Sequence, residues 1–289
     1  MAISGKTRVC GVIGDPIEHT LSPIMHNAAF NHLKLDFVFL AFRVKDVELE
    51  NAIRGMRALG IHGLNVTMPH KSAVTGYLDE VDPTVKFVGS VNTILNGDGR
   101  LLGFNTDGVG ALKALKENGV NPNGKKLLLL GAGGAAKAIA FAAAKEVGEL
   151  VLLNRTPEKT RDLAEVLSRT FNKKVVGDTL SPSTIQKNLQ DTDILINATS
   201  VGMHPHSSQS LIAPQWLKPE LIVMDIVYNP IETRLMKDAK AAGAQVINGV
   251  EMLIYQGAAS FEIWTGRSAP IEVIRRAALN KLSSAGVSK

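Results

Sequence analysis

Hydrophobic and polar positions alternate along the first hundred residues with two different periods. Short apolar runs typical of strands occupy residues 9–13, 37–41 and 64–66, and stretches of helical periodicity occupy residues 22–33 and 47–59. This βαβαβ order favours a mainly parallel sheet with helices on its faces. The segment Asn-Gly-Asp-Gly at residues 96–99 then predicts a turn between two short strands, and a helix is expected from 107 to 117.

The rest of the chain continues this alternation of strands and helices. The leucine run at 127–130 predicts a buried strand, and the alanine-rich segment after it predicts a helix. Further strands are expected at 149–154, 174–176, 193–196, 221–225 and 245–247, with helices between most of them. Two helical patterns end the chain, and Pro270 opens the second of them. The pattern predicts an α/β protein.

Length and composition narrow the class of protein. A chain of 289 residues exceeds the usual size of one domain, so two domains are expected. A hydrophobic content of 45% and a charged content of 20% are typical of soluble globular proteins. The chain has no apolar run of about 18 residues and no signal-peptide pattern at its start, which favours a cytoplasmic location. Cys10, the only cysteine, lies in an apolar run and is expected to be an inert core thiol.

The formal net charge of +5 does not indicate nucleic acid as a partner, because basic residues are spread among acidic ones without interleaved aromatics. A mild positive excess suits small anionic ligands equally well. The seven histidines form no convincing pair of metal ligands; His204 and His206, separated by a proline in a serine-rich loop, make a poor tetrahedral site. We therefore expect no metal site and no membrane partner.

A glycine motif follows the leucine run. The segment "GAGGAA" has Gly131, Gly133 and Ala136 in the GxGxxG/A pattern, directly between an expected strand and an expected helix. The first glycine permits a tight turn, the second lets the backbone approach a pyrophosphate, and the helix N-terminus attracts the anion. Residues 131–135, which are Gly131, Ala132, Gly133, Gly134 and Ala135, are therefore predicted to bind a dinucleotide. The alternative is a turn that serves helix packing alone.

The end of the next strand indicates which dinucleotide is bound. NAD-binding domains place an Asp or Glu there to accept a hydrogen bond from the ribose 2′-hydroxyl. This chain instead has Asn154, Arg155 and Thr156, with Lys159 one turn later. A guanidinium suits a 2′-phosphate through charge-assisted hydrogen bonds, so NADP is predicted in preference to NAD. The alternative is that Arg155 only solvates the start of a helix.

The segment "NVTMPHK" places polar groups at the end of another strand. Pro69 cannot donate to a sheet, so the apolar run ends near Val66 and leaves Asn65, Thr67 and Lys71 at its exit. Ligands of open α/β sheets bind beyond the carboxyl ends of strands, which makes these three residues candidates for substrate binding. On its own, Lys71 would equally suit a solvated turn.

Nine motifs together resemble the shikimate dehydrogenase family over nearly the whole chain: "GDPIEHTLSPIMHNAAF", "NVTMPHK", "VNT", "GFNTDG", "GAGGAA", "NRT", "NATSVGM", "YNP" and "NGVEMLIYQGAASF". The resemblance implies an NADP-dependent oxidoreductase of aromatic amino-acid (chorismate) biosynthesis that reversibly reduces 3-dehydroshikimate to shikimate. It also implies a substrate domain of residues 1–107 completed by helices at 250–289, and a doubly wound Rossmann-type NADP domain at 108–249 across an interdomain cleft. A small-molecule substrate is thus the expected partner, and a homodimer is left open.

The same resemblance assigns individual residues. Its substrate contacts fall on Thr20, Ser22, Asn65, Thr67, Lys71, Asn92, Asp107, Tyr228 and Gln256. Its cofactor contacts fall on the glycine loop, Asn154, Arg155, Thr156, Thr199, Ser200, Gly249 and Met252, to which the charge pattern after the strand adds Lys159. Thr20 departs from the family, which more often has serine there; a hydroxyl remains, but the added methyl alters the fit. For Met252 a packing role is an alternative, because it shares helical spacing with Gln256.

Reduction of a ketone by hydride requires a proton donor near the developing alkoxide. Lys71 is the expected acid and base, and Asp107 is expected to orient it; a coupled pair of this kind can also share the role. Two other functions stay open. One is a quinate/shikimate dehydrogenase with relaxed choice of substrate or cofactor, and the other is a non-catalytic NADP-binding sensor that retains the fold.

Overall fold

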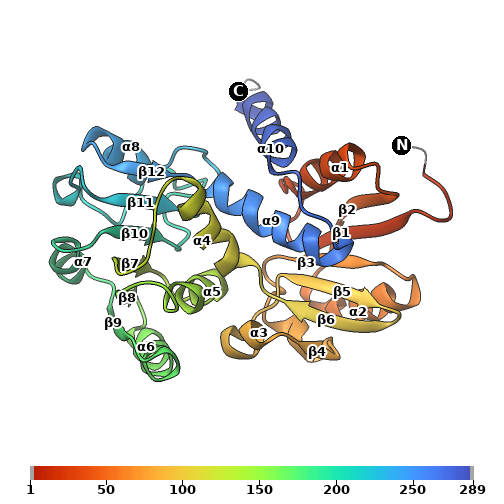
Figure 1. The fold of residues 1–289 in the computed structure, drawn as a ribbon, viewed down its shortest axis with the longest axis horizontal. Helices are drawn as coiled ribbons and strands as arrows, with labels where there is room; N and C mark the ends of the chain where they lie inside the picture. Colours follow the sequence, from red (N-terminus) through yellow and green to blue (C-terminus); the bar gives the residue numbers. More distant parts are fainter. Residues whose placement is uncertain (1–2, 287–289) are drawn as a thin grey trace. The chain divides into compact units, whose positions relative to one another are not determined.

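Two separate six-stranded sheets organise the chain (Figure 1). The computed structural model describes residues 3–286, so the outer ends of the predicted substrate domain, residues 1–2 and 287–289, lie outside the described residues. The sheets belong to two compact units, one built from the chain up to Thr106 and from Ile254 onward, the other from Asp107–Leu253. The chain therefore leaves the first unit once and returns to it once.

The first unit contains a mixed sheet with strand order β2-β1-β3-β5-β6-β4. Strand β1 pairs in parallel with both β2 and β3, whereas β5 is antiparallel to β3 and to β6. The strands are β1 (Arg8–Gly14), β2 (Phe37–Arg43), β3 (Gly63–Val66), β4 (Glu80–Val81), β5 (Thr93–Gly97) and β6 (Arg100–Phe104). The predicted hairpin at 96–99 is confirmed, with Asp98 and Gly99 at positive φ. The expectation of a mainly parallel sheet is confirmed: β4 is also parallel to β6, and β5 is the strand of this sheet that runs against its two neighbours.

Helices of the first unit follow the apolar periodicity. They are α1 (Ser22–His32), the 3₁₀ turn Asp46–Glu48, α2 (Leu49–Ala58), the 3₁₀ turn Ala73–Tyr77 and α3 (Pro83–Val88). Helix α2 buries Leu49, Ile53 and Met56, which lie on one face at helical spacing. The sequence analysis did not predict α3, although its start carries a clear signal. The Asp82 side chain accepts a hydrogen bond from the Val85 N–H, and a proline occupies the first turn.

The second unit has a fully parallel sheet with strand order β12-β11-β10-β7-β8-β9. Its strands are β7 (Lys126–Leu130), β8 (Glu149–Asn154), β9 (Lys174–Thr179), β10 (Ile194–Asn197), β11 (Ile222–Asp225) and β12 (Gln245–Ile247). In chain order, β7, β8 and β9 extend toward one edge of the sheet. The chain then returns to the other side of β7, where β10, β11 and β12 extend toward the opposite edge. This order confirms the doubly wound prediction and puts the switch point between β7 and β10, where such sheets bind ligands.

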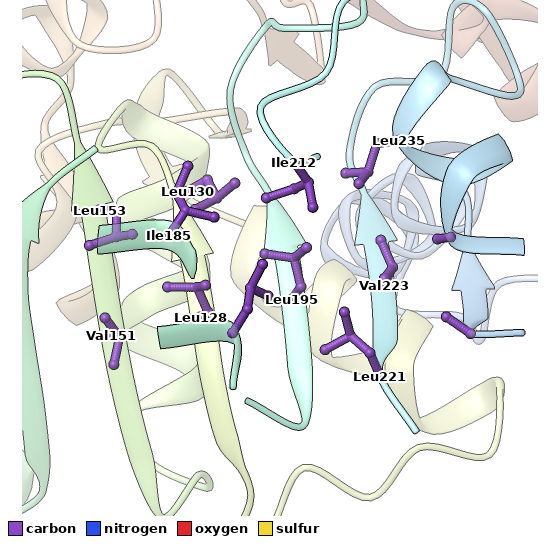
Figure 2. Close-up of a cluster of buried hydrophobic side chains, with 13 residues drawn as sticks. Leu128, Leu130, Val151, Leu153, Ile185, Leu195, Ile212, Leu221, Val223 and Leu235 are labelled. Carbon is purple, nitrogen blue, oxygen red and sulfur yellow. The ribbon is translucent and has the colours of Figure 1, made fainter. Parts of the chain in front are cut away.

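Both faces of this parallel sheet are covered. Its helices are α4 (Asp107–Glu117), α5 (Gly134–Ala143), α6 (Pro157–Phe171), α7 (Pro182–Leu189) and α8 (Arg234–Ala241), with a 3₁₀ turn at Pro214–Trp216. On one face, strand residues such as Leu128 and Leu195 pack with Ile185 of α7 and Leu235 of α8 (Figure 2). Leu129, which alternates with them, is fully buried on the other face. Burial on both sides explains the unbroken leucine run of β7.

Helices α4 and α5 pack so closely that one contact between them involves backbone. A Cβ atom at Gly108 would overlap the carbonyl oxygen of Ala138, so only glycine fits at this position. The first turn of α4 is consequently held directly against α5.

Helix α9 (Gly249–Thr265) begins in the second unit and ends in the first, where α10 (Ile271–Gly286) packs against α1. Its last turn fixes Trp264, whose indole Nε1 donates to the Ile94 carbonyl at 3.0 Å, while His62 Nε2 lies 2.8 Å from the Trp264 carbonyl oxygen. The indole lies over Gly63 of β3 so tightly that a Cβ atom there would overlap the ring. No helix among residues 3–286 is both long and apolar enough to span a bilayer.

Substitution Gly63→Ala should therefore destabilise the first unit. The added methyl must displace Trp264 or β3, an overpacking that typically costs about 1–3 kcal/mol. Urea denaturation followed by tryptophan fluorescence measures the change. Gly55→Ala in α2 is the control, because a Cβ there meets nothing within 4 Å and alanine favours a helix. Equal stability of the two variants would contradict the predicted steric role of Gly63.

Candidate active site

A cluster of buried polar side chains lies where β3, β5, β6 and α9 meet in the first unit. Asn65 of β3 stands opposite Thr93 of β5, because these strands are antiparallel and Asn65 pairs with Thr93. Asn92 precedes β5, Thr106 follows β6, and Ser260 comes from α9. All five side chains are less than 7% exposed. Buried polar groups are costly unless they are hydrogen-bonded, so the bonding of each one is informative.

Asn92 is held at both ends of its carboxamide. Its Oδ1 accepts from the Thr106 N–H at 2.9 Å and from the Thr93 hydroxyl at 2.9 Å. Its Nδ2 donates to Thr106 Oγ1 at 2.9 Å and to Gln256 Oε1 at 3.4 Å. A backbone N–H can only donate, so the contact with Thr106 fixes which end of the amide is oxygen.

Asn65 is bonded through its nitrogen alone. Its Nδ2 lies 3.1 Å from the Asn92 carbonyl oxygen, 3.3 Å from Thr93 Oγ1 and 3.1 Å from Ser260 Oγ. Its Oδ1 is buried and accepts no hydrogen bond from the described part of the chain. An unbonded buried oxygen of this kind is unusual. The Asn65 side chain also interacts with the buried imidazole of His26.

Lys71 and Asp107, the predicted proton-transfer pair, are carried by different units. Lys71 is half-buried in the turn after β3, and its carbonyl oxygen accepts from the Val91 N–H at 2.7 Å. Asp107 is the first residue of α4 and is 4% exposed. The Thr106 N–H donates to Asn92 Oδ1, so the residue directly before Asp107 is held in place. The pairing of Lys71 with Asp107 stays a prediction.

Four further predicted substrate residues, two from loops and two from helices, belong to the first unit. Thr20 Oγ1 lies 3.2 Å from Ser22 Oγ, and Ser22 opens α1. The first turn of α1 has no acidic residue, the Ser22 N–H donates to Thr20 Oγ1 at 3.3 Å, and Pro23 has no N–H to offer. The half-buried Thr67 follows β3, and its N–H donates to the Ile13 carbonyl. Gln256 reaches the cluster from α9 through Asn92.

The glycine loop lies at the switch point of the parallel sheet. Gly131 has φ = +112°, and a Cβ atom there would lie 2.8 Å from the Ala198 carbonyl oxygen, so the tight turn requires glycine. Gly133 is the N-cap of α5, and a Cβ there meets nothing within 4 Å. The first turn of α5 carries neither a side-chain cap nor an acidic group. Ala132, Gly134 and Ala135 complete a loop with room and free N–H groups for an anion.

The residues after β8 are accessible. Asn154 is half-buried, and its Nδ2 donates to the Thr156 carbonyl at 3.1 Å, which shapes the turn into α6. Arg155, Thr156 and Lys159 are exposed. The nearest acid in sequence is Glu158, also exposed. Two cations therefore stand at the end of β8, where an NAD-specific domain would have a carboxylate.

Residues after β10 and β11 are organised by a buried carboxylate that the sequence analysis missed. Asp225 accepts from Asn197 Nδ2 at 3.0 Å, from the Val227 N–H at 3.1 Å and from the Thr233 hydroxyl at 2.7 Å. Burial raises the pKa of Asp225 to about 6, against the effect of these bonds. Asn197 Oδ1 in turn accepts from Thr199 Oγ1 at 2.7 Å. The signal was available, since Asp225 ends an otherwise apolar strand.

The remaining predicted cofactor and substrate residues belong to the second unit. Ser200 is exposed beside Thr199. Gly249 opens α9, and a Cβ there would lie 2.5 Å from the Ile226 carbonyl oxygen, so glycine is needed for packing. Met252 is 6% exposed, which agrees with the packing role kept as an alternative. Tyr228 is half-buried, and burial raises the pKa of its hydroxyl.

His26 is a second buried titratable group absent from the predicted site. It comes from α1, is 1% exposed and stacks on Phe39 with ring centroids 4.4 Å apart. Burial lowers the pKa of His26 to about 3, although the nearby Asn65 side chain opposes this shift. Its Nδ1 has no hydrogen-bond partner within residues 3–286. His26 is therefore neutral in the folded protein at physiological pH.

No three His, Cys, Asp or Glu side chains within residues 3–286 are arranged to hold a metal ion. Cys10 is buried, and burial raises the pKa of its thiol, so it has the character of an inert core residue.

Three family models match the chain. They are the shikimate dehydrogenase substrate binding domain over residues 12–94, shikimate / quinate 5-dehydrogenase over residues 113–237, and the shikimate 5'-dehydrogenase C-terminal domain over residues 249–279. A shikimate dehydrogenase (NADP(+)) of Methanopyrus kandleri is 47% identical over 285 residues, which cover 98% of each chain.

Solved structures show the same relationship. A crystal structure of a shikimate dehydrogenase in complex with NADP+ matches with a TM-score of 0.91 and 44% identity, covering 97% of this chain and 98% of that one. A shikimate 5-dehydrogenase of Listeria monocytogenes in complex with shikimate and NAD matches with a TM-score of 0.90 and 41% identity, covering 96% and 98%.

The neutral state of His26 predicts an acid-sensitive fold. Unfolded histidine binds a proton near pH 6.5, whereas the folded group resists it down to about pH 3. Stability should therefore be full above pH 6.5 and fall as the pH drops, by about 2 kcal/mol at pH 5. His26→Gln should lose this dependence, so its difference in unfolding free energy from wild type should shrink by that amount between pH 7 and 5.

Urea denaturation at several pH values measures the effect. His32→Gln, at an exposed position of the same helix, is the matched control. Parallel pH profiles for wild type and His26→Gln would show that the buried imidazole does not cause the dependence.

Proposed function

The chain belongs to the shikimate dehydrogenase family, and from this membership we propose that it catalyses the reversible, NADP-dependent reduction of 3-dehydroshikimate to shikimate. The activity would serve aromatic amino-acid biosynthesis. The observation that carries the proposal is the buried amide cluster of the first unit, in which Asn65 Oδ1 is left without a partner among the described residues. A ring that bears several hydroxyl groups matches such a site, because each hydroxyl both donates and accepts.

The carboxylate of the substrate is assigned to Thr20 and Ser22. Their hydroxyls are 3.2 Å apart, and the first turn of α1 contains no acidic side chain that would repel an anion. A helix N-terminus stabilises a negative charge by a fraction of a kcal/mol to about 1 kcal/mol, more where water is excluded. Asn65, Thr67, Asn92 and Gln256 are proposed to bind the ring hydroxyls, and Tyr228 to line the pocket.

Lys71 is proposed to give a proton to the carbonyl oxygen as hydride reaches the adjacent carbon, and to take it back in the oxidation of shikimate. Bound NADP supplies or accepts the hydride. In reduction, the C–H and O–H bonds form together and the C=O double bond becomes single, so the charges balance if Lys71 ends neutral. Asp107 is proposed to orient the ammonium group and to share its titration.

The second unit fits NADP. The open N-terminus of α5 and the glycine loop suit the pyrophosphate, and Arg155 and Lys159 suit a 2′-phosphate. Asn154, Thr156, Thr199 and Ser200 are proposed to line the adenosine part of the site. Gly249 and Met252 are proposed to lie by the nicotinamide.

Two alternatives have specific features that distinguish them. Relaxed use of NAD is raised by the Listeria monocytogenes relative, whose structure contains NAD, and use of quinate by the matching shikimate / quinate 5-dehydrogenase model. A non-catalytic NADP sensor would bind cofactor without turnover. Oxidation of shikimate and of quinate, each with NADP and with NAD and followed by absorbance of the reduced nicotinamide, decides among them. The proposed function requires turnover of shikimate with NADP to exceed the other three combinations.

We also propose that the protein is cytoplasmic and forms a homodimer. Gel filtration coupled to light scattering decides between monomer and dimer, and cell fractionation tests the location.

Removal of the Lys71 amine should lower turnover more than binding. We expect Lys71→Ala to reduce kcat by about 10²- to 10⁴-fold, the usual contribution of a general acid. Steady-state kinetics in both directions give kcat and KM separately. Lys86→Ala, at an exposed position of α3, is the control. A variant that kept wild-type kcat with only a raised KM would exclude proton transfer by Lys71.

Removal of the Arg155 guanidinium should weaken the preference for NADP. The ratio of kcat/KM for NADP to that for NAD is expected to fall at least about 10-fold, because a charge-assisted bond to the 2′-phosphate is lost. Arg169→Ala, in the last turn of α6, the helix that follows Arg155, should leave the ratio unchanged. An unchanged ratio in Arg155→Ala would assign phosphate recognition to another group.

A further inference from the structure

Asp225 of the second unit is a buried carboxylate whose hydrogen-bond partners are all neutral. The residue is fully buried and accepts from Asn197 Nδ2, the Val227 N–H and the Thr233 hydroxyl at distances of 2.7–3.1 Å. No Lys, Arg or His side chain within residues 3–286 forms an ion pair with it. A buried charge is costly and is usually paired with an opposite charge or a metal ion, so this carboxylate is unusual.

The negative charge of Asp225 is only partly offset by its surroundings. Arg234 is the first cation after Asp225 in the sequence, and it pairs with Asp238 at 2.7 Å. Thr233 is the N-cap of α8, so the positive end of that helix offsets part of the charge. Burial raises the pKa of Asp225 to about 6, and the carboxyl group is therefore ionised at about pH 8.

Asp225 belongs to the half of the parallel sheet that is expected to hold the nicotinamide. A doubly wound sheet has two mononucleotide-binding halves, one on each side of the switch point. Strands β7, β8 and β9 form the half that carries the glycine loop and Arg155, which are proposed to hold the pyrophosphate and the adenosine phosphate. Strands β10, β11 and β12 form the other half, and Asp225 is the last residue of β11, at the carboxyl edge where ligands bind.

Two close backbone contacts place the carboxylate beside the proposed cofactor site. The residue of β10 that donates to Asp225 directly precedes Ala198, whose carbonyl oxygen would lie 2.8 Å from a Cβ atom at Gly131 of the glycine loop. Ile226 directly follows Asp225, and its carbonyl oxygen would lie 2.5 Å from a Cβ atom at Gly249. Asp225 therefore lies between the glycine loop and the residue proposed to be near the nicotinamide.

We propose that Asp225 supplies a fixed negative charge to the nicotinamide half of the site, so that the protein favours NADP+ over NADPH more than an uncharged site would. The oxidised nicotinamide ring has a positive charge that the reduced ring lacks, whereas the phosphate groups are the same in both forms. The carboxylate therefore attracts the oxidised ring selectively. The inference rests on the proposed function and specifies which redox form of its cofactor the site favours.

Asp225→Asn removes the charge and keeps the shape of the side chain. The new amide oxygen can accept from Asn197 and from the Val227 N–H, and the new amide nitrogen can donate to the Thr233 hydroxyl oxygen, so all three contacts can persist. Dissociation constants for NADP+ are measured by titration calorimetry and those for NADPH by its fluorescence, at about pH 8 and without shikimate.

The ratio of Kd for NADP+ to Kd for NADPH should rise at least about 5-fold in Asp225→Asn. At an effective dielectric constant of about 20, one unit charge changes the binding of another about 10 Å away by roughly 15-fold. Asp225→Ser is a second uncharged variant, and it should raise the ratio in the same direction if Asp225→Asn is not obtained folded.

Two controls separate the charge from other effects of substitution. Thr233→Val removes one hydrogen bond to the carboxylate and the cap of α8 but keeps the charge, so the ratio should stay within about 2-fold of wild type. Asp162→Asn, at an exposed position of α6, removes a negative charge that solvent screens, and it should also leave the ratio unchanged.

The possible outcomes distinguish this inference from the proposed function. An unchanged ratio in a folded, uncharged variant at position 225, or an equal change in Thr233→Val, would overturn the inference and leave Asp225 as a structural link between β10 and α8. Failure of the wild type to bind NADP+ and NADPH would instead overturn the proposed function. Because the measurement needs no turnover, a protein that binds both forms but does not oxidise shikimate would still decide the role of Asp225.

Discussion

The hydrogen bond from the Thr106 N–H to Asn92 Oδ1 is the constraint on which the arrangement of the first unit's polar cluster depends. It fixes one carboxamide, and the bonds of that carboxamide then determine its neighbours. Asn92 Nδ2 meets Gln256 of α9, Asn92 Oδ1 receives the Thr93 hydroxyl, and the Asn92 carbonyl orients Asn65. Three strands and a helix from the far end of the sequence are thereby joined through one residue, Asn92. Because the cluster is buried, loss of a single partner leaves polar atoms unbonded, which costs about 1–3 kcal/mol each.

The parallel sheet depends on a different constraint, the reversal of strand order at β7. The chain turns at Gly131, and the residue there must be glycine because the Ala198 carbonyl of the adjacent segment leaves no room for a side chain. The leucines of β7 are buried on both faces, as expected for a strand in the middle of the sheet. The turn and the free N-terminus of α5 follow from these two facts. The buried carboxylate of Asp225 then ties the ends of β10 and β11 together beside the loop.

Much of this could be predicted from sequence because the signals are local. The strand and helix periods located most elements, the Asn-Gly-Asp-Gly segment located the hairpin, and the glycine motif located the helix N-terminus at the switch point. Helix α3 was missed although Asp82 and Pro83 mark its start, because it is only six residues long. The hairpin segment predicted the antiparallel pairing of β5 with β6, but no local signal predicted the pairing of β5 with β3.

The candidate site was less predictable because its bonding is tertiary. Motif resemblance gave Asn65 and Asn92, but nothing in the sequence shows that Asn65 uses only its nitrogen toward the protein. Ser260 meets Thr93 and Asn65, which lie 167 and 195 positions earlier in the chain. His26 reads as an ordinary helix residue until its burial against Phe39 is known.

The backbone contact between α4 and α5 has a mechanical consequence. Gly108 touches the Ala138 carbonyl without an intervening side chain, so the two helices have no compressible layer between them. Asp107 immediately precedes this contact, and the glycine loop immediately precedes α5. The Asp107 carboxylate and the glycine loop are therefore carried by two helices in direct backbone contact. A shift of α5 that moves the glycine loop must also move α4 and Asp107.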